Sequence, residues 1–587
     1  MPTPDRRAFL AAFASTGVAS TLLPGVLWAQ MQPGTKVVTV EMVREAAKLA
    51  GTELTDAEAA DLTSSLSSLA RGAEGIDKKT LTNASPLPIH FDPRPHGVKI
   101  PAPPTTSLLR LDPVPPSLRV SAPSTSLRDA AASRGDASVS RVESLAFWPV
   151  THLAHLVRTR QITSTELTTM YLSRLKRYNP QLNCVAELTE TRALAEAAAA
   201  DKETAAGRYR GVLHGIPYGV KDIIAAKGYP TRWGAKPLEA QTFDDDATVV
   251  ARLRDAGAVL VAKLTTGELA FGDQWAGGRT NNPWNLQQGS SGSSAGPASA
   301  MGAALVAFSI GSDTGGSILF PAARCGIVGI RPTFGRVSRH GVMTAGSSLD
   351  KIGPMCRTVQ DCAIVLHAIA GPDNLDLAVP DNIPVTFDAT KGRYPKRVGY
   401  VPAMLAAGNN VEQRANNERV MATLKQLGCT LVELDAFPSG DLSYFIEYTE
   451  RAAAFESLVA AGLYKGVSVR TGRYLRACAL VTAADYLQAN RRRAVIMQDV
   501  ARRLANVDVV MFTALTLSSV SSLNPVMSLT GHPSIAVPNG FAADGTPTAV
   551  MFSGQLYREG DLLALAKAYE DVGRYYEKQP SLFQVSS

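Results

Sequence analysis

Two loops rich in glycine and serine lie only a helix and a strand apart in this chain. The first, at 289–296, reads GSSGSSAG, and the second, at 311–317, reads GSDTGGS. An alanine-rich stretch between them predicts a helix over about 297–306, and a short apolar strand follows over 305–310, with the boundary between the two left open. An ordered helix and strand at this place argue against a flexible linker. They predict a loop–helix–strand–loop unit inside a packed domain.

The chain on both sides of this unit alternates between helical and strand patterns. Thr163 and Glu166 fit a capping box, which is a signal that starts a helix. Alanine-rich or amphipathic stretches predict further helices, and short apolar runs predict buried strands. The helices are expected at 188–207 and 247–257, and the strands at 216–220 and 259–262. This alternation predicts an α/β fold over residues 146–580, with helices packed against a central sheet.

The first 29 residues are typical of an export signal. Arg6 and Arg7 precede an uncharged and mildly apolar stretch, as in a twin-arginine signal peptide. The alternative is a membrane anchor, because the uncharged run is almost long enough to span a bilayer. Pro24 and Gly25 make it a poor span. We therefore expect a signal that is cleaved, no stable membrane insertion afterwards, and a periplasmic or secreted protein.

Two further segments precede the α/β region. Residues 30–85 are predicted to be a helical extension, with two short helices within 37–72 and a capping box from Thr55 to Glu58. Residues 86–145 are predicted to be an extended connector, because eleven prolines between positions 86 and 123 exclude helices and central strands.

Composition gives little evidence for special partners. The net charge is +7, but the basic residues are spread widely apart from a cluster at 491–493, which we interpret as a solvated helix face. Without a basic stripe, interleaved aromatics or a known motif, we expect no nucleic-acid partner. Six cysteines show no CxxC pair, and His152 with His155 is too small a set for a metal site, so no metal is expected.

The second glycine-rich loop has the residue types that acyl transfer requires. Gly315 and Gly316 allow the backbone to approach a ligand closely, and their N–H groups can point at a developing oxyanion. Ser317 ends this turn at an expected helix start, so its hydroxyl is a candidate nucleophile. A serine needs a base. Folding could bring a histidine, but Lys221, at the end of the apolar run 216–220, is another candidate because burial lowers the pKa of a lysine.

These motifs together resemble the amidase signature family. Ser293 and Ser317 are 24 residues apart, which fits the family pattern without a gap. The resemblance covers about 146–580 and implies an α/β/α layered fold with a large, mixed, twisted central sheet. The matching segments are GVKD at 219–222, SSAG at 293–296, GSDTGGS at 311–317, HGIP at 214–217, DKIGP at 350–354 and LTGHP at 529–533.

The resemblance also implies a mechanism and a set of residues. Ser317 is the expected nucleophile, Ser293 the bridging serine after a cis peptide bond, and Lys221 the base that takes the proton through Ser293. The implied reaction forms an acyl-enzyme from a small-molecule amide, releases the amine and ends with attack by water, without a metal or an organic cofactor. The expected oxyanion donors are the backbone amides of Thr314, Gly315, Gly316 and Ser317.

One position departs from the family pattern, and one rival catalytic assignment remains. The family often has arginine two residues after the nucleophile, whereas this chain has Leu319, which suggests an apolar pocket wall. Residues 292–296 also match the Gly-x-Ser-x-Gly elbow of α/β-hydrolases, with Ser294 as nucleophile and His532 as base. That elbow must follow a buried strand, whereas residues 281–288 are polar and contain proline. We therefore interpret His532 as a residue that packs a turn.

Three classes of function are compatible with these residues. The first is an amidase that hydrolyses a carboxylic amide. The second is the glutaminase, or A-type, subunit of a tRNA-dependent amidotransferase, because residues 37–72 loosely resemble the small C subunit of such complexes. The third is a binding protein on an amidase scaffold, which nothing in the sequence favours. The export signal argues against the second class, because aminoacyl-tRNA and ATP are cytoplasmic. The natural amide and the oligomeric state stay open.

Overall fold

The computed structural model describes nine stretches of the chain, and these form two units, residues 1–81 and 82–587. The predicted export signal at 1–29 lies outside the described residues. Within the described stretches, no helix combines the length and the apolar character that crossing a membrane requires. The stretches are 38–49, 54–63, 90–113, 142–381, 383–389, 394–406, 411–478, 481–513 and 523–584.

The described part of the first unit is helical. It contains α3 (Val40–Leu49) and a helical stretch at 56–63. The predicted capping box is present, because the Glu58 N–H donates to Thr55 Oγ1 at 3.3 Å and the Thr55 N–H donates to Glu58 Oε2 at 2.8 Å. Both short helices expected within residues 37–72 are therefore found.

Residues 90–113 of the proline-rich connector belong to the second unit and contain no helix, whereas its last described residues, 142–145, begin with a short helical turn. It carries one short strand, β1 (Leu108–Arg110), which pairs in parallel with β12 (Thr386–Asp388). Phe91 packs edge-to-face on Phe334, with the ring centroids 5.1 Å apart. The connector thus lies along the rest of this unit as an extended chain.

One large mixed sheet organises the second unit. Among the described residues it has eleven strands in the order β14-β13-β15-β17-β16-β10-β11-β9-β3-β4-β2. The interior strand β9 pairs in parallel with β3 and antiparallel to β11. The predicted α/β fold with a large mixed sheet is therefore confirmed. The strands are β2 (Val185–Leu188), β3 (Pro217–Lys221), β4 (Val259–Leu264), β9 (Phe308–Asp313), β10 (Val328–Arg331), β11 (Lys351–Cys356), β13 (Arg397–Tyr400), β14 (Thr430–Glu433), β15 (Val509–Thr513), β16 (Ser534–Phe541) and β17 (Pro547–Gly554).

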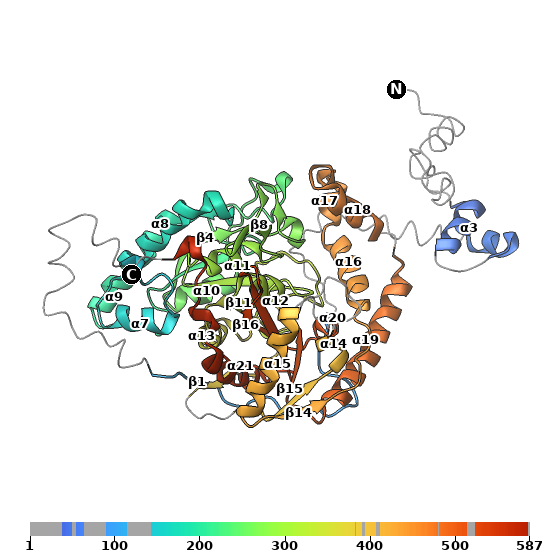
Figure 1. Cartoon of the computed structure of the whole chain (residues 1–587). Helices are drawn as coiled ribbons and strands as arrows, with labels where there is room; N and C mark the ends of the chain where they lie inside the picture. The colour runs from blue at the N-terminus through green and yellow to red at the C-terminus, as the bar shows by residue number, and fades with distance from the viewer. Residues whose placement is uncertain are drawn as a thin grey trace. The chain divides into compact units, whose positions relative to one another are not determined.

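Helices cover this sheet, as Figure 1 shows. α8 and α9 pack on the end formed by β4, α11 and α13 pack on the middle, and α15 and α21 pack on β16 and β17. The apolar faces of these helices and the sheet form the core. The helices are α7 (Val150–Arg158), α8 (Ser164–Leu182), α9 (Glu190–Ala205), α10 (Thr248–Asp255), α11 (Ala295–Gly302), α12 (Leu319–Cys325), α13 (Val359–Ile369), α14 (Pro402–Ala406), α15 (Val411–Gln426) and α21 (Glu559–Gly573).

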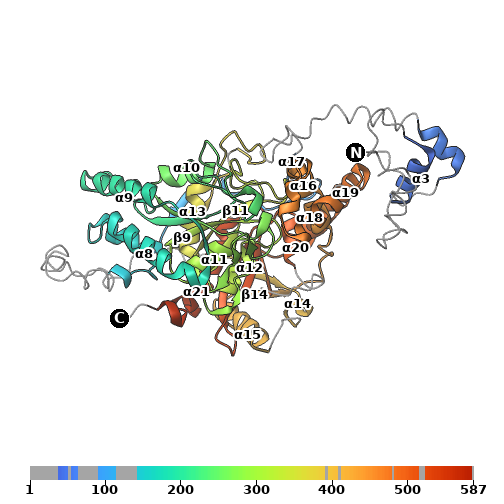
Figure 2. The same ribbon diagram turned by 90° about the horizontal axis from the view of Figure 1, so that it is seen from above.

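A second group of helices gathers around α16 beside the sheet (Figure 2). α16 contacts α17, α18, α19 and α20, so these helices form one cluster. The cluster supplies several charged side chains to the site described below. Its members are α16 (Leu442–Ala454), α17 (Glu456–Ala460), α18 (Val469–Cys478), α19 (Ala483–Leu504) and α20 (Asn524–Leu529).

The basic cluster at 491–493 on α19 is not wholly a solvated face, so that prediction is wrong for one of its three members. Arg491 and Arg492 are exposed, but Arg493 is only 1% exposed. Its guanidinium donates to the carbonyls of Leu529 and Ser348, at 2.7 and 2.9 Å. Burial lowers the pKa of Arg493 to about 10. Partners distant in sequence satisfy this buried cation.

Candidate active site

Lys221 lies at the end of β3, between β9 and β4 in the sheet, and is completely buried. Its Nζ lies 2.7 Å from Ser293 Oγ and 2.9 Å from Ser312 Oγ. Burial lowers the pKa of Lys221 to about 7, although the carboxylates of Asp313 and Asp350 oppose this shift. A large part of the Lys221 population therefore carries a neutral amine near neutral pH, and that amine is already in contact with Ser293.

Ser293 and Ser294 are neighbours with different surroundings. The peptide bond between Gly292 and Ser293 is cis, and Ser293 is 2% exposed. Ser294 Oγ instead donates to the Ser312 carbonyl at 3.0 Å and accepts from the Ser312 N–H at 3.2 Å. Ser293 thus faces Lys221, whereas Ser294 joins its loop to the backbone of β9.

The elbow assignment is contradicted by these surroundings. The hydroxyl of Ser294 is buried and engaged at both its donor and its acceptor sites, so it is not placed as an exposed nucleophile. The strand before it, β8 (Asn285–Gly289), pairs with β7 (Asn281–Asn282) outside the large sheet. His532 is buried in the turn before β16, where its Nδ1 lies 2.8 Å from Thr530 Oγ1. Burial lowers the pKa of His532 to about 3.

Ser317 lies on the turn between β9 and α12. It is partly exposed, in contrast to the buried Ser293 and Lys221, so solvent reaches this position. The Ser317 carbonyl accepts from the Ser294 N–H at 3.1 Å, which ties the two glycine-rich loops together. Among the residues that the structure describes, no hydrogen bond joins the hydroxyls of Ser293 and Ser317.

The N–H groups of this turn are not equivalent. The Gly316 N–H donates to Asp313 Oδ1 at 2.7 Å, and the Ile318 N–H donates to Asp313 Oδ2 at 2.8 Å. Gly316 is therefore occupied as a donor, contrary to its expected role at an oxyanion. The N–H groups of Gly315 and Ser317 make no hydrogen bond within the described part of the chain. These two groups are donors that an anion can use.

Asp313 also explains why α12 begins at Leu319 rather than at the expected Ser317. Its carboxylate accepts from the amides of Gly316 and Ile318, with a longer contact of 3.4 Å to the Leu319 N–H. A carboxylate at this place satisfies the unpaired N–H groups at the start of a helix, as a capping residue does. The turn therefore stays open up to Ile318, and the helix starts behind it.

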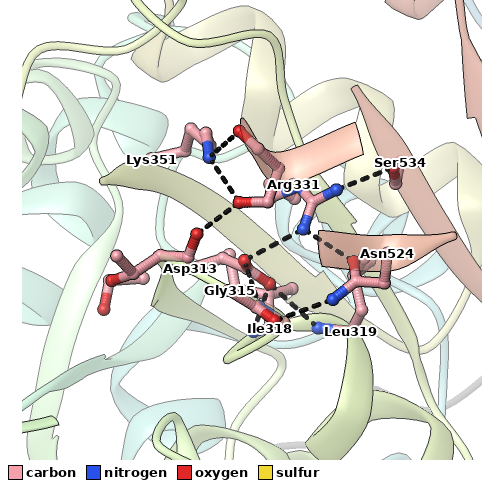
Figure 3. A network of polar contacts seen from close by, with 12 residues as sticks. Asp313, Gly315, Ile318, Leu319, Arg331, Lys351, Asn524 and Ser534 are labelled. Carbon is pink, nitrogen blue, oxygen red and sulfur yellow. Dashed lines mark hydrogen bonds and ion pairs between the residues drawn. The ribbon is translucent and has the colours of Figure 1, made fainter. Parts of the chain in front are cut away.

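A buried ionic network supports the turn (Figure 3). Arg331 Nη1 lies 3.2 Å from Asp313 Oδ1 and donates to Asn524 Oδ1 at 2.7 Å. The Asn524 amide then donates to the Gly315 carbonyl at 2.7 Å. Burial opposes ionisation of Asp313, but Arg331 and Lys351 lower its pKa below the usual value. Asp313 is thus a charged carboxylate that fixes the turn.

Two contacts hold the first residue of the turn, Thr314. Its hydroxyl donates to Asp350 Oδ1 at 2.6 Å, and its carbonyl accepts from the hydroxyl of Ser528. Ser528 Oγ also accepts from Lys351 Nζ at 2.9 Å. No role was predicted for Asp313, Asp350 or Lys351, although all three belong to the motifs quoted above. Their position inside those motifs was the signal that could have found them.

Leu319 was expected to line an apolar pocket wall, and it is fully buried in the core. The helix that carries it, α12, packs on β10, β16 and β17. Within the described stretches, no group of three or more His, Cys, Asp and Glu side chains is arranged to hold a metal ion.

Comparison with known proteins shows the family to which this chain is related. Residues 166–563 match the family described as Amidase. The A-type subunit of glutamyl-tRNA(Gln) amidotransferase from Thermosynechococcus vestitus (strain NIES-2133 / IAM M-273 / BP-1) is 35% identical over 476 residues, 73% of this chain and 98% of the relative. Its counterpart from Coxiella burnetii (strain Dugway 5J108-111) is 34% identical over 481 residues, 74% and 99% of the two chains.

Solved structures give the same result. The native peptide amidase from Stenotrophomonas maltophilia superposes with a TM-score of 0.68 at 30% sequence identity, covering 76% of this chain and 100% of that one. The family match covers more than half of the chain, and the relatives align over nearly their whole length. This protein is an enzyme that acts on carbon–nitrogen amide bonds. The chain belongs to the amidase family.

Proposed function

We propose that this enzyme hydrolyses a carboxylic amide through an acyl-enzyme on Ser317, with Ser293 and Lys221 carrying the proton. The observation that supports this most is the buried contact of 2.7 Å between Lys221 Nζ and Ser293 Oγ, beside a serine that solvent can reach. A lysine with a pKa lowered to about 7 supplies the base that a serine nucleophile needs.

In each half of the proposed reaction, one proton moves through Ser293 to Lys221 and then back through Ser293 to the leaving group. Ser317 Oγ attacks the amide carbon, and its proton passes to Ser293 while the Ser293 proton passes to Lys221. The tetrahedral intermediate then expels the amine, which takes the proton back from Lys221 through Ser293. Water attacks the acyl-enzyme by the same relay and releases the carboxylic acid.

The turn at Ser317 supports stabilisation of the intermediate. The N–H groups of Gly315 and Ser317 make no hydrogen bond within the described residues, and they belong to the same turn as the nucleophile. Donors fixed before the reaction stabilise a developing oxyanion without reorganisation, and one such donor is worth about 10²–10³ in kcat. Thr314 remains a third expected donor.

The test is covalent labelling of the purified protein with a fluorophosphonate, followed by intact mass and peptide mapping. We expect one adduct on Ser317 that is absent from Ser317→Ala. An adduct on Ser294 or another serine, with Ser317 unmodified, contradicts the assignment. Release of ammonia or amine from a simple amide, without ATP or tRNA, completes the test of hydrolysis.

The second candidate function is that of an amidotransferase A-type subunit, favoured by the names of the relatives that are 34–35% identical. In that case the chain releases ammonia from glutamine and passes it to a partner enzyme. Ammonia release that depends on added partner subunits and glutamyl-tRNA, with no hydrolysis of other amides, supports this candidate over the first.

We also propose that residues 1–29 direct the protein out of the cytoplasm in folded form. The paired Arg6 and Arg7 before an uncharged stretch support this. Fractionation of cells that express the full chain is the test, with Arg6→Lys/Arg7→Lys as the matched variant. Export of the wild type and retention of the variant are expected, and equal cytoplasmic retention of both refutes the proposal.

A further inference from the structure

A buried carboxylate lies beside the candidate oxyanion turn, and the amide reaction as described does not use it. Glu447 on α16 is 7% exposed, and its Oε2 lies 3.3 Å from the place that a Cβ on Gly315 would occupy. Its other oxygen, Oε1, accepts from Arg451 Nη2 at 2.5 Å. Oε2 itself makes no hydrogen bond in the part of the chain that the structure describes.

The position of this oxygen has an electrostatic consequence. A carboxylate next to Gly315 repels the negative charge that develops on the oxygen of the intermediate. Arg451 offsets part of that repulsion, because it pairs with Oε1 and also donates to the Leu269 carbonyl. A positive group on the substrate, placed against Oε2, offsets the remaining repulsion between Glu447 and the oxyanion. The same group gives Oε2 a hydrogen-bond partner.

Aromatic side chains lie next to the same ion pair. Arg451 lies over the ring of Phe271, 4.0 Å from its centroid, and Tyr448 and Tyr474 pack on Phe271 with centroids 5.8 and 6.2 Å away. All three rings are partly exposed. The chain at Phe271 also borders the catalytic loop, because the Gly272 carbonyl occupies the space where Gly292 would carry a Cβ.

We propose that Glu447 is a specificity-determining residue, and that it binds the ammonium group of amides with an amino group on the carbon next to the scissile carbonyl. The partly exposed rings of Phe271, Tyr448 and Tyr474 accept an aromatic or apolar side chain of the same acyl part. This inference rests on the proposed amide hydrolysis and narrows its substrate class to amides of amino acids.

The experiment compares two amides that differ only in the amino group. L-phenylalaninamide carries the ammonium group and 3-phenylpropanamide lacks it. We measure kcat/KM for both at pH 7 with the wild type and with Glu447→Gln, which keeps the volume and an acceptor for Arg451. The ratio of the two values within one protein cancels the amount of folded enzyme, and comparing this ratio between the wild type and Glu447→Gln cancels the difference in intrinsic reactivity between the two amides.

The expected result is a preference of the wild type for L-phenylalaninamide, with the ratio falling at least about tenfold in Glu447→Gln through loss of the charged partner. The matched control is Asp441→Asn, which removes an exposed carboxylate at the start of the same helix and should leave the ratio unchanged. An unchanged ratio in Glu447→Gln, within about twofold, overturns the proposal.

Failure of this inference is separable from failure of the proposed function. A wild type that cleaves neither amide but is labelled at Ser317 by the fluorophosphonate refutes the substrate class and leaves the nucleophile intact. A wild type that cleaves neither amide and is not labelled at Ser317 refutes both.

Discussion

The amine of Lys221 lies 2.7 Å from the hydroxyl of Ser293, and both side chains are closed off from solvent. Surface lysines are charged and flexible, whereas this one is held at the end of an interior strand with a second contact to Ser312 at 2.9 Å. Burial at the end of β3 thus removes the water that would hydrate the ammonium group of Lys221. In the proposed mechanism, that loss of hydration is what makes Lys221 a base at neutral pH.

Replacing Lys221 by methionine should abolish turnover while the protein stays folded. Methionine fills a similar volume but cannot accept a proton, so we expect kcat to fall by about 10³-fold or more. Steady-state release of amine or ammonia measures this, with circular dichroism as the check on folding. The matched control is Lys236→Met, because Lys236 is an exposed lysine that pairs with Glu239. Turnover within tenfold of the wild type in Lys221→Met contradicts the lysine base.

The adjacent serines Ser293 and Ser294 should respond in opposite ways to alanine. Ser293→Ala removes the relay between Lys221 and the nucleophile, so activity should fall by about 10²–10⁴-fold with little change in stability. Ser294→Ala leaves buried groups of Ser312 without partners, so stability should fall by about 1–3 kcal/mol with activity retained in the folded fraction. Measurement of urea unfolding and of kcat on both variants checks these two predictions. Equal effects of the two substitutions on kcat argue against distinct roles.

The pH dependence of the reaction should follow the ionisation of Lys221. Because the proposed base is the neutral amine, kcat/KM should rise about tenfold per pH unit below the pKa and level off above about pH 7. A rate profile from pH 5 to 9 measures this. A rate that falls on going from pH 6 to 8 contradicts a lysine base in this site.

The lowered pKa of Lys221 also predicts how the stability of the protein depends on pH. The unfolded chain holds the Lys221 proton up to about pH 10.5, whereas the native protein releases it near pH 7. Between these values the unfolded state binds more protons, so native stability rises with pH. The stability of the wild type relative to Lys221→Met should therefore increase between pH 7 and pH 10, as urea unfolding of both proteins would show. A constant difference over this range contradicts the lowered pKa.

Short-range patterns predicted the elements but not their long-range partners. Two capping boxes, at Thr55 and Thr163, and the strand that ends at Lys221 were predicted from neighbouring residues and are present. The start of α12 was misplaced because Asp313 occupies the amides of the turn, and nothing local distinguishes that use of an aspartate from a surface carboxylate. Glu447 was missed because it reaches Gly315 from a helix about 130 residues further along the chain.

The arginines at 491–493 also show that local sequence patterns do not predict long-range contacts. A run of three basic residues is typical of a solvated surface, but a helix turns by about 100° per residue, so consecutive side chains point in different directions. Whether one of them is buried depends on what packs there. Here Phe91 of the connector covers Arg493, with its ring centroid 3.3 Å from the guanidinium carbon. That contact joins positions about 400 residues apart, and no local pattern encodes it.

The two neighbours Arg492 and Arg493 therefore offer a matched test of buried against exposed charge. Arg493→Gln leaves the carbonyls of Ser348 and Leu529 without their donor and removes the contact with Phe91, so the free energy of unfolding should fall by about 2–4 kcal/mol. Arg492→Gln on the exposed face should change it by less than about 0.5 kcal/mol. Urea unfolding of the two variants measures the difference.

Arg493 also fixes the loop at Ser348, which precedes Asp350 and its contact with Thr314, so kcat should fall in Arg493→Gln alone. Similar stability and kcat in both variants contradict this role of Arg493.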